Sequence, residues 1–353
     1  MTDTAVLADV VPTIRPLDQE TALAAQTALD GKTKPRGSLG RLEALAVQLA
    51  AIAGTVTPEP VRAAIVVAAG DHGYAEEGVS AYPQEVTRQM LANFVAGGAA
   101  VSVLARAVDA EVVVVDAGVV APVEDERIRT VRIGPGTANA TRGPAMTREQ
   151  ALRAIEAGAA LADELASRGV NAIVLGEMGI GNSTAAAAVH AELLGVDAAV
   201  VCGPGTGLDA TGMRRKVEVV ERARAANPSP GDAVDVVAAL GGFEIAFLVG
   251  VALGAAANSI AVVLDGFIVC AAALVAARLA PTAAEYMIAA HVSTEPGHAL
   301  GLRALGLSPL LDLELRLGEG SGGALALPLL RAARSILVEM ATFVDAGVTD
   351  AGR

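Results

Sequence analysis

An acidic residue set among glycines is the strongest chemical signal in this sequence. Glu319 stands in the run LGEGSGG, residues 317–323, near the C-terminus. Glycines leave room for a flat ligand to approach a carboxylate. The surrounding segments are apolar, so we expect Glu319 to be partly desolvated, which raises a carboxyl pKa and suits a general base near neutral pH. The alternative is a charged residue at a flexible turn before the next helix, and the local sequence does not separate the two.

A second candidate site is the run GIGNST, residues 179–184, which follows a predicted strand and opens an alanine-rich helix. Successive glycines expose backbone N–H groups and a helix N-terminus adds positive potential, so Gly179, Gly181, Asn182 and Ser183 can form an anion-binding nest. The spacing is neither a Walker A loop nor a GxGxxG fingerprint, so ATP and NAD are not implied. The alternative is a tight turn with Asn182 or Ser183 as N-cap, and we favour the phosphate interpretation.

Two further groups of residues carry weaker signals. Lys216, one of three lysines, follows the glycine-rich turn GPGTG at 203–207 and either reaches a phosphate as a point charge or lies on a solvated helix face. Ser80, Tyr82 and Gln89 could line a slot for a planar base, although Pro83 at a helix start is also ordinary structure.

The sequence carries no recognisable metal motif. Its four histidines show no metal-ligand spacing. No pair of adjacent acids follows an apolar strand, as in transferases that hold magnesium against a pyrophosphate. We therefore predict no metal site and no cofactor.

Composition limits the class of protein. The chain has 353 residues, of which 53% are hydrophobic and only 2% aromatic, so its core must be built from Ala, Val, Leu and Ile with closely packed helices. The net charge of -13 argues against nucleic acid and anionic membranes as partners. Cys202 and Cys270 lie in apolar runs, where reduced buried thiols are expected.

No targeting segment is predicted. Acidic residues near the N-terminus argue against a signal peptide. Polar residues interrupt the apolar stretch 245–277 before it reaches the roughly 18 residues that a membrane span needs. We expect a soluble, cytoplasmic protein.

Strands and helices alternate from about residue 62. Short β-branched runs at 63–69, 111–116, 170–175, 198–202 and 260–264 read as buried parallel strands. Thr147 and Gln150 form a capping box ahead of a long helix that ends at Gly169. This alternation predicts an α/β fold, a three-layer sandwich with a mostly parallel sheet. Glycines and acids gather after the strands, which places one cleft at their carboxyl ends.

The two ends of the chain are predicted to form a smaller helical lobe. Amphipathic helices occupy about 17–29 and a segment ending at Gly54, and another helix runs from about 325 to 343. We expect residues 61–306 to form the α/β nucleotide-binding domain, and 1–60 with 307–353 to form the lobe that carries the Glu319 loop.

Together these motifs resemble the nicotinate-nucleotide–dimethylbenzimidazole phosphoribosyltransferase family of cobalamin assembly. The resemblance covers nearly the whole chain and is carried by AAGDHGYAEEGVSAYPQEVTRQMLANFVAGGAA (68–100), GEMGIGNSTAAAA (176–188), GGFEIAFLVGVAL (241–253), VLDGFI (263–268), LRLGEGSGGALALP (315–328) and KPRGSLGRLE (34–43).

The resemblance implies transfer of phosphoribose from nicotinate mononucleotide to 5,6-dimethylbenzimidazole, with inversion, giving α-ribazole 5′-phosphate and nicotinate. Glu319 corresponds to the family's base, and Glu177 to a second acid that binds ribose hydroxyls or orients the base. The nest residues with Lys216 would hold the phosphate, and Ser80, Tyr82, Gln89 and Met178 would border the benzimidazole. The family also implies a homodimer.

Two alternatives remain at this level. The same transfer to another base or a phenol differs only in pocket shape, and one methyl group is worth about 1–3 kcal/mol of discrimination. A non-catalytic nucleotide sensor would keep the anion nest but leave the acid idle.

Overall fold

A six-stranded sheet forms the centre of the structure. The computed structural model describes residues 5–205, 207–228 and 230–349. In the part of the chain described, the strands lie in the order β3-β2-β1-β4-β5-β6 and every pair is parallel. Their bounds are β1 Ala63–Gly70, β2 Glu111–Gly118, β3 Ile128–Thr130, β4 Ala172–Met178, β5 Ala261–Leu264 and β6 Met287–Ala289. β1 is buried along its whole length, as expected of a central parallel strand covered on both faces.

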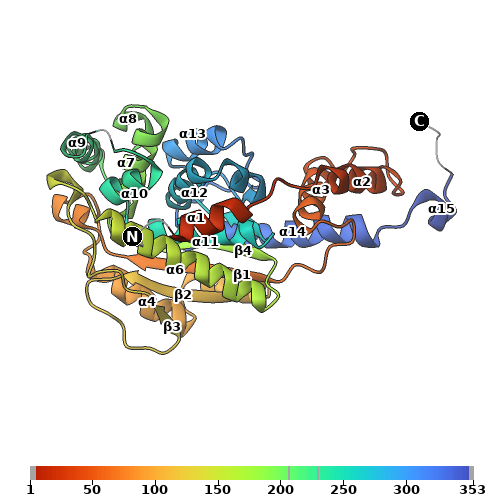
Figure 1. The fold of residues 1–353 in the computed structure, drawn as a ribbon, viewed down its shortest axis with the longest axis horizontal. Coiled ribbons are helices and arrows are strands. Elements are labelled where there is room, and N and C mark those ends of the chain that lie inside the picture. Colours follow the sequence, from red (N-terminus) through yellow and green to blue (C-terminus); the bar gives the residue numbers. More distant parts are fainter. Residues whose placement is uncertain (1–4, 206, 229, 350–353) are drawn as a thin grey trace.

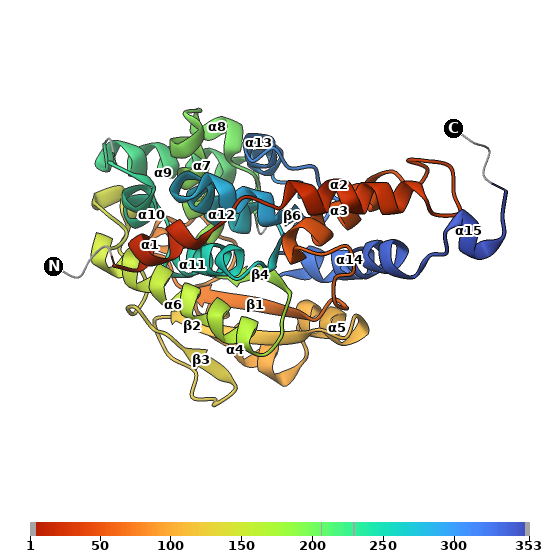
Figure 2. The same ribbon diagram turned by 45° about the vertical axis from the view of Figure 1, so that its right-hand side comes forward.

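Helices cover both faces of this sheet (Figures 1 and 2). α11 (Phe243–Ala257) and α12 (Phe267–Leu279) pack on one face, with α6 (Arg148–Ser167) against α11. α4 (Glu85–Ala96), α5 (Ala100–Ala107) and the first turns of α14 (Ser321–Glu339) pack on the other. The remaining helices are α1 Ala5–Val10, α2 Gln19–Asp30, α3 Arg41–Ala53, α7 Asn182–Leu194, α8 Ala198–Val201, α9 Ala210–Ala226, α10 Ala233–Leu240, α13 Pro296–Ala304 and α15 Phe343–Ala346. The predicted three-layer α/β sandwich is confirmed.

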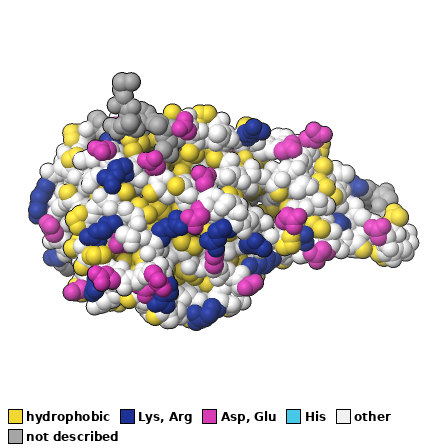
Figure 3. Space-filling view, turned by 60° about the horizontal axis from the view of Figure 1, so that its bottom comes forward, with side chains coloured by type: hydrophobic (Ala, Val, Ile, Leu, Met, Phe, Trp, Pro, Cys, Tyr) yellow, Lys and Arg dark blue, Asp and Glu magenta, His cyan; other side chains and the backbone are white. Residues whose placement is uncertain are grey.

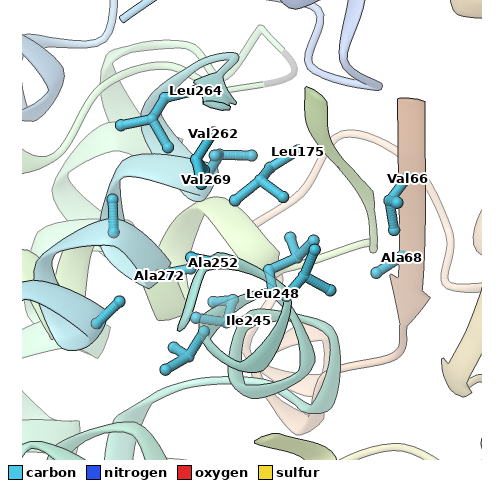
Figure 4. Close-up of a cluster of buried hydrophobic side chains, with 14 of the residues drawn as sticks. Val66, Ala68, Leu175, Ile245, Leu248, Ala252, Val262, Leu264, Val269 and Ala272 are labelled. Carbon is cyan, nitrogen blue, oxygen red and sulfur yellow. The ribbon is translucent and has the colours of Figure 1, made fainter. Parts of the chain in front are cut away.

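Alternate residues of the central strands point to the two helical layers. Val66 and Ala68 of β1 and Leu175 of β4 face α11 and α12 in the cluster shown in Figure 4. Ile65 and Val174 instead contact the first turn of α14. Because successive side chains of a strand point to opposite faces, the same strands pack against both helical layers.

Small residues bring α6 and α11 close together. Gly158 of α6 and Gly250 of α11 leave no room for a methyl group, because it would overlap the carbonyl oxygens of Phe247 and Ile155 in the facing helix. The alanine-rich composition therefore leads to near contact between helix backbones.

The lobe projects from the sheet. α2, α3 and α14 pack on one another and extend away from the α/β body (Figures 1 and 2). An isolated bridge joins Lys32 to Thr342, and the Lys32 Nζ donates to the Met340 carbonyl at 2.6 Å. α1, however, packs on α6 and α11 of the larger body, so the first helix does not lie with the lobe.

One predicted strand is wrong. Residues 198–202 fold as α8, a four-residue helix followed by Cys202, and Val200 is exposed there while Val201 is buried. A short apolar run fits a buried strand and a buried helix equally well, and here it packs against α7 and α13 rather than beside a strand. The capping box of Thr147 and Gln150 is confirmed.

The apolar stretch 245–277 is divided between α11, β5 and α12, all buried in the core. Two other helical segments, 85–107 and α14, are long and apolar enough to cross a membrane by composition, with half of the α14 window buried. A core helix passes the same test, so this evidence is weak. Both cysteines are free and buried, as expected.

Charged side chains of both signs are interspersed on the face of the molecule shown in Figure 3. That face carries no continuous basic surface of the kind that nucleic acid requires. The absence of a nucleic-acid partner stays a prediction.

Candidate active site

A cavity of about 370 Å³ opens at the carboxyl ends of β4, β5 and β6. Its walls come from segments that follow those strands, from Tyr82 with α4, and from the loop Arg316 to Glu319. The sheet order changes direction between β1 and β4, and ligands of open parallel sheets bind beside such a point. The cavity therefore lies where the fold favours a ligand.

Glu319 enters this cavity from a strained loop. Gly318, Glu319 and Gly320 all have positive φ, at 84°, 64° and 91°. Glutamate rarely adopts this conformation, which costs about 1–3 kcal/mol unless the surroundings enforce it. The loop packs directly on β4, because a side chain on Gly176 would overlap the Glu319 carbonyl oxygen.

Burial raises the proton affinity of the Glu319 carboxyl. The residue is 6% exposed, and the Val101 backbone N–H at the start of α5 donates to its Oε2 at 3.2 Å. Desolvation raises the pKa of Glu319, the Val101 hydrogen bond lowers it in part, and the charge of Asp265 raises it again. The flexible-turn interpretation does not fit a buried, hydrogen-bonded carboxyl.

Asp265 fixes the loop that carries Glu319. It follows β5 directly and accepts hydrogen bonds from the Gly320 N–H at 3.1 Å and the Gly323 N–H at 3.0 Å. It therefore caps α14, whose own N-cap residue is a glycine without a capping side chain. The Asp265 side chain at the end of β5 thus positions the backbone beside Glu319, although the two residues are far apart in the sequence.

Glu177 is the second acid of the cavity. It lies near the end of β4, and its Oε2 accepts a hydrogen bond from the Asn182 side-chain amide. Burial, and then the charge of Asp265, raise the pKa of Glu177 to about 8. A side chain on Gly318 would overlap the Glu177 carboxyl, so the glycine lets the Glu319 loop approach this acid.

The glycine-rich run forms the start of α7. Gly181 is the N-cap residue with φ of 98°, and Gly179, Asn182 and Ser183 line the cavity. Gly181 lies beneath them, against His72 and the backbone that follows it. Backbone and side-chain donors at the N-terminus of this 13-residue helix give the cavity a positive end.

Lys216 lies behind this positive end rather than on a solvated helix face. It is fully buried, and its Nζ donates to the Ser183 Oγ at 3.0 Å and to the Gly203 carbonyl at 2.9 Å. Burial lowers the pKa of Lys216, while nearby Glu295 raises it. The ammonium contacts the nest through Ser183 and does not line the cavity itself.

An apolar slot completes the cavity. Tyr82 and Met178 line it, together with Val86, Met90 and Phe267.

Two residues predicted for this slot do not line it. Gln89 is exposed on α4, because Val86 and Met90, four residues apart, occupy the face toward the cavity and Gln89 is rotated about 100° from Met90. Ser80 accepts a hydrogen bond from the Tyr82 N–H at 3.1 Å and so supports the segment that carries Tyr82.

A buried hydrogen-bonded pair of side chains lies beneath the start of α7. His72 Nε2 lies 2.7 Å from Glu244 Oε1, and both side chains are fully buried. A methyl group on Gly179 would lie 3.3 Å from the His72 ring, so the loop rests closely on this pair. His72 therefore takes part in a structural hydrogen bond.

Several lining residues escaped the sequence analysis, namely Val86, Met90, Phe267, His291, Ser293, Glu295 and Arg316. Most have no local signal, since tertiary packing brings them to the cavity. Arg316 does have a local signal in the sequence. It is a basic residue three positions before Glu319, in the same loop.

The fold and the site define an α/β protein in which a glycine-rich helix N-terminus, a desolvated acid and an apolar slot surround one cavity. Comparison with known proteins agrees. A family model described as "Phosphoribosyltransferase" matches residues 14–348. Two proteins named nicotinate-nucleotide–dimethylbenzimidazole phosphoribosyltransferase are similar along almost their full length. The one from Chloroflexus aggregans is 50% identical and covers 98% of each chain, and the one from Pseudomonas fluorescens is 53% identical and covers 94% of each.

The crystal structure of CobT from Thermus thermophilus has a TM-score of 0.91 and 49% identity, covering 94% of this chain and 99% of that one. The chain belongs to the nicotinate-nucleotide–dimethylbenzimidazole phosphoribosyltransferase family, and it is a transferase.

Proposed function

We propose that this enzyme transfers phosphoribose from nicotinate mononucleotide to 5,6-dimethylbenzimidazole, with Glu319 as the general base. The observation that carries the proposal is a buried acid of raised pKa in the same cavity as a helix N-terminus built from GIGNS. The nest, with Lys216 behind Ser183, would hold the 5′-phosphate. Tyr82, Met90 and Met178 would border the benzimidazole.

The proposed step balances without an added acid. One benzimidazole nitrogen attacks the anomeric carbon while the bond from that carbon to the pyridinium nitrogen breaks. The bonding pair returns to the pyridine ring, so nicotinate leaves with a neutral nitrogen. The proton on the second benzimidazole nitrogen passes to Glu319. Attack opposite the leaving group converts a β-nucleotide into an α-riboside.

Glu177 has a separate proposed role. With a pKa of about 8 it is mostly protonated at neutral pH, and so it can donate a hydrogen bond as well as accept one. We assign it to the ribose hydroxyls or to orienting the base. Its neutral form also avoids placing a second negative charge beside the Glu319 carboxylate.

The test is a turnover assay with purified enzyme, nicotinate mononucleotide and dimethylbenzimidazole in the presence of a chelator. We expect nicotinate and α-ribazole 5′-phosphate in equal amounts. Absence of nicotinate release, with or without added divalent metal, would contradict the proposed function. Turnover that appears only with metal would contradict the metal-free mechanism alone.

A related acceptor is a second candidate, and the slot gives a reason to consider it. Val86, Met90, Met178 and Phe267 supply an apolar surface, and methionine adapts its shape to different ligands. Competition of dimethylbenzimidazole with an unsubstituted benzimidazole and a phenol in one reaction measures the preference. A non-catalytic nucleotide sensor would instead bind the mononucleotide without any turnover.

We further propose a homodimer whose interface includes the projecting lobe. Projection of α2, α3 and α14 from the body, with Leu23 70% exposed, supports an interface there. The division of the chain into an α/β domain, residues 61–306, and a lobe formed by the two terminal segments stays a proposal. Within it, α1 belongs to the α/β domain, because it packs on α6 and α11. Cytoplasmic location also stays a prediction.

A further inference from the structure

Arg316 has a place in the cavity that the proposed chemistry leaves unused. It is the only lysine or arginine among the described residues that line the cavity. Its side chain is exposed, and within the described chain no hydrogen bond or ion pair holds its guanidinium. By contrast, Arg331 and Arg334 on α14 each donate to backbone carbonyls of neighbouring segments. A free guanidinium facing a cavity is available for a ligand.

The charges around Arg316 show what kind of ligand it suits. Three carboxyl side chains line the same cavity, those of Glu177, Glu295 and Glu319. His291 also lines it, with Nε2 3.6 Å from Asp265. An anionic group entering here needs a cation, because it would otherwise face like charges in a partly desolvated space.

The position of Arg316 separates it from the phosphate nest. The nest lies at the start of α7 and has Lys216 behind it. Arg316 begins the loop whose other end is Glu319, so the loop runs from an exposed arginine to a buried acid. Leu317, which is also exposed, adds an apolar side chain to the same part of the cavity wall.

We propose that Arg316 forms a subsite for an aromatic carboxylate, and that this subsite selects a nicotinate donor over a nicotinamide donor. The inference rests on the proposed function and deepens it. The donor carries two anions, and the nest accounts for the phosphate alone. The planar guanidinium offers two parallel N–H groups that match the two oxygens of a carboxylate. A carboxamide offers one oxygen, and its NH₂ group would face the guanidinium donors.

The test compares two donors that differ only in this group. Steady-state kcat and KM are measured with nicotinate mononucleotide and with nicotinamide mononucleotide for the natural enzyme, Arg316→Gln and Arg316→Lys. For Arg316→Gln we expect kcat/KM with the nicotinate donor to fall about 10- to 100-fold, mainly through KM, as for loss of a charge-assisted hydrogen bond. The preference between donors should shrink by the same factor, and Arg316→Lys should retain part of it.

Arg303→Gln is the matched control. Arg303 lies exposed on α13 and does not line the cavity, and the substitution removes the same charge. We expect it to leave the donor preference unchanged. Equal losses with both donors in Arg316→Gln would overturn the subsite, because Arg316 would then act on a group that the donors share.

A binding measurement keeps the subsite testable even if no turnover is seen. Calorimetry with free nicotinate and free nicotinamide should show tighter binding of nicotinate by the natural protein, and loss of that difference in Arg316→Gln. Equal binding of both by the natural protein refutes the subsite. Missing turnover together with selective nicotinate binding refutes the proposed function and leaves the subsite standing.

Discussion

At position 319 two unfavourable features coincide in one residue. A glutamate adopts a left-handed backbone conformation, and its carboxyl is buried where desolvation raises the pKa. Among the described residues no arginine or lysine pairs with it, and only the Val101 N–H compensates it. Strain and burial of this kind persist at functional sites because the surrounding structure enforces them. This combination is the reason to place the chemistry at Glu319.

Glu319→Gln is therefore expected to reduce kcat by about 10² to 10⁴, the usual worth of a general base. The amide keeps the shape of the side chain but cannot accept the proton. Calorimetry should show that both substrates still bind. Glu314→Gln, an exposed acid on the same segment that also has positive φ, is the control and should keep normal turnover. Near-normal turnover of Glu319→Gln would remove this residue from the role of base.

The pKa of Glu177 makes a separate prediction about stability. The folded pKa of about 8 lies above the ordinary glutamate value of 4.5, so the folded state holds a proton that the unfolded state releases between these values. This contribution to the free energy of unfolding is complete below about pH 4.5 and is lost as pH rises through about 8. One such proton changes the free energy by about 1.4 kcal/mol per pH unit in that window.

Urea unfolding of the natural protein and Glu177→Gln at several pH values from 5 to 8 measures this contribution. The natural protein should lose stability more steeply with rising pH than the variant. Glu192→Gln, at a half-buried residue on α7 that pairs with Arg224, controls for removal of a carboxyl from the same region. Parallel curves for the natural protein and Glu177→Gln would show that Glu177 titrates alike in both states.

At the scale of elements, the strands with a clear hydrophobic pattern in the sequence were predicted, and those without one were not. The strands near 63–69, 111–116 and 260–264 were predicted within about two residues because continuous β-branched runs mark central parallel strands. β3 and β6 were missed, since each is a three-residue edge strand with too few positions to show a pattern.

The same contrast holds for the candidate site. Glycines mark the nest and the Glu319 loop locally, because only a residue without a side chain allows these close approaches. The slot depends on which face of α4 turns inward. A rotation of one residue along that helix exchanges Gln89 for Met90, and the packing that sets it comes from distant parts of the chain. The sequence therefore located the buried acid and the glycine-rich start of α7 better than the residues that line the slot.

The contact of α6 with α11 carries the third prediction. Gly250→Ala would drive a methyl group into the Ile155 backbone, which cannot move aside as a flexible side chain can. We expect the free energy of unfolding to fall by about 1–3 kcal/mol or more, as in overpacked cores. Gly31→Ala is the control, because φ there is -82° and the nearest atoms lie at 3.6 and 3.8 Å. Urea unfolding that shows no loss for Gly250→Ala would mean that the two helices separate easily.

At the scale of the molecule, the projecting lobe leaves apolar side chains without cover. Leu23 on α2 and Val344 on α15 are 70% and 89% exposed, and both elements lie at the end of the molecule away from the sheet (Figures 1 and 2). Contact with a second copy would bury such side chains, and a symmetric interface uses the same surface of both chains. Because the lobe extends away from the α/β body, a second copy of the chain could pack against it.

We expect light scattering to give a mass of twice 35.3 kDa for the natural protein. Leu23→Glu combined with Val344→Glu places two charges on each lobe and should shift the mass toward one chain, because burying unpaired carboxylates opposes association. Val200→Glu changes an exposed valine on α8, in the α/β body, and should leave the mass as it is. A natural protein that has the mass of one chain at micromolar concentration would contradict the dimer. A dimer that survives the double substitution would place the interface on another surface.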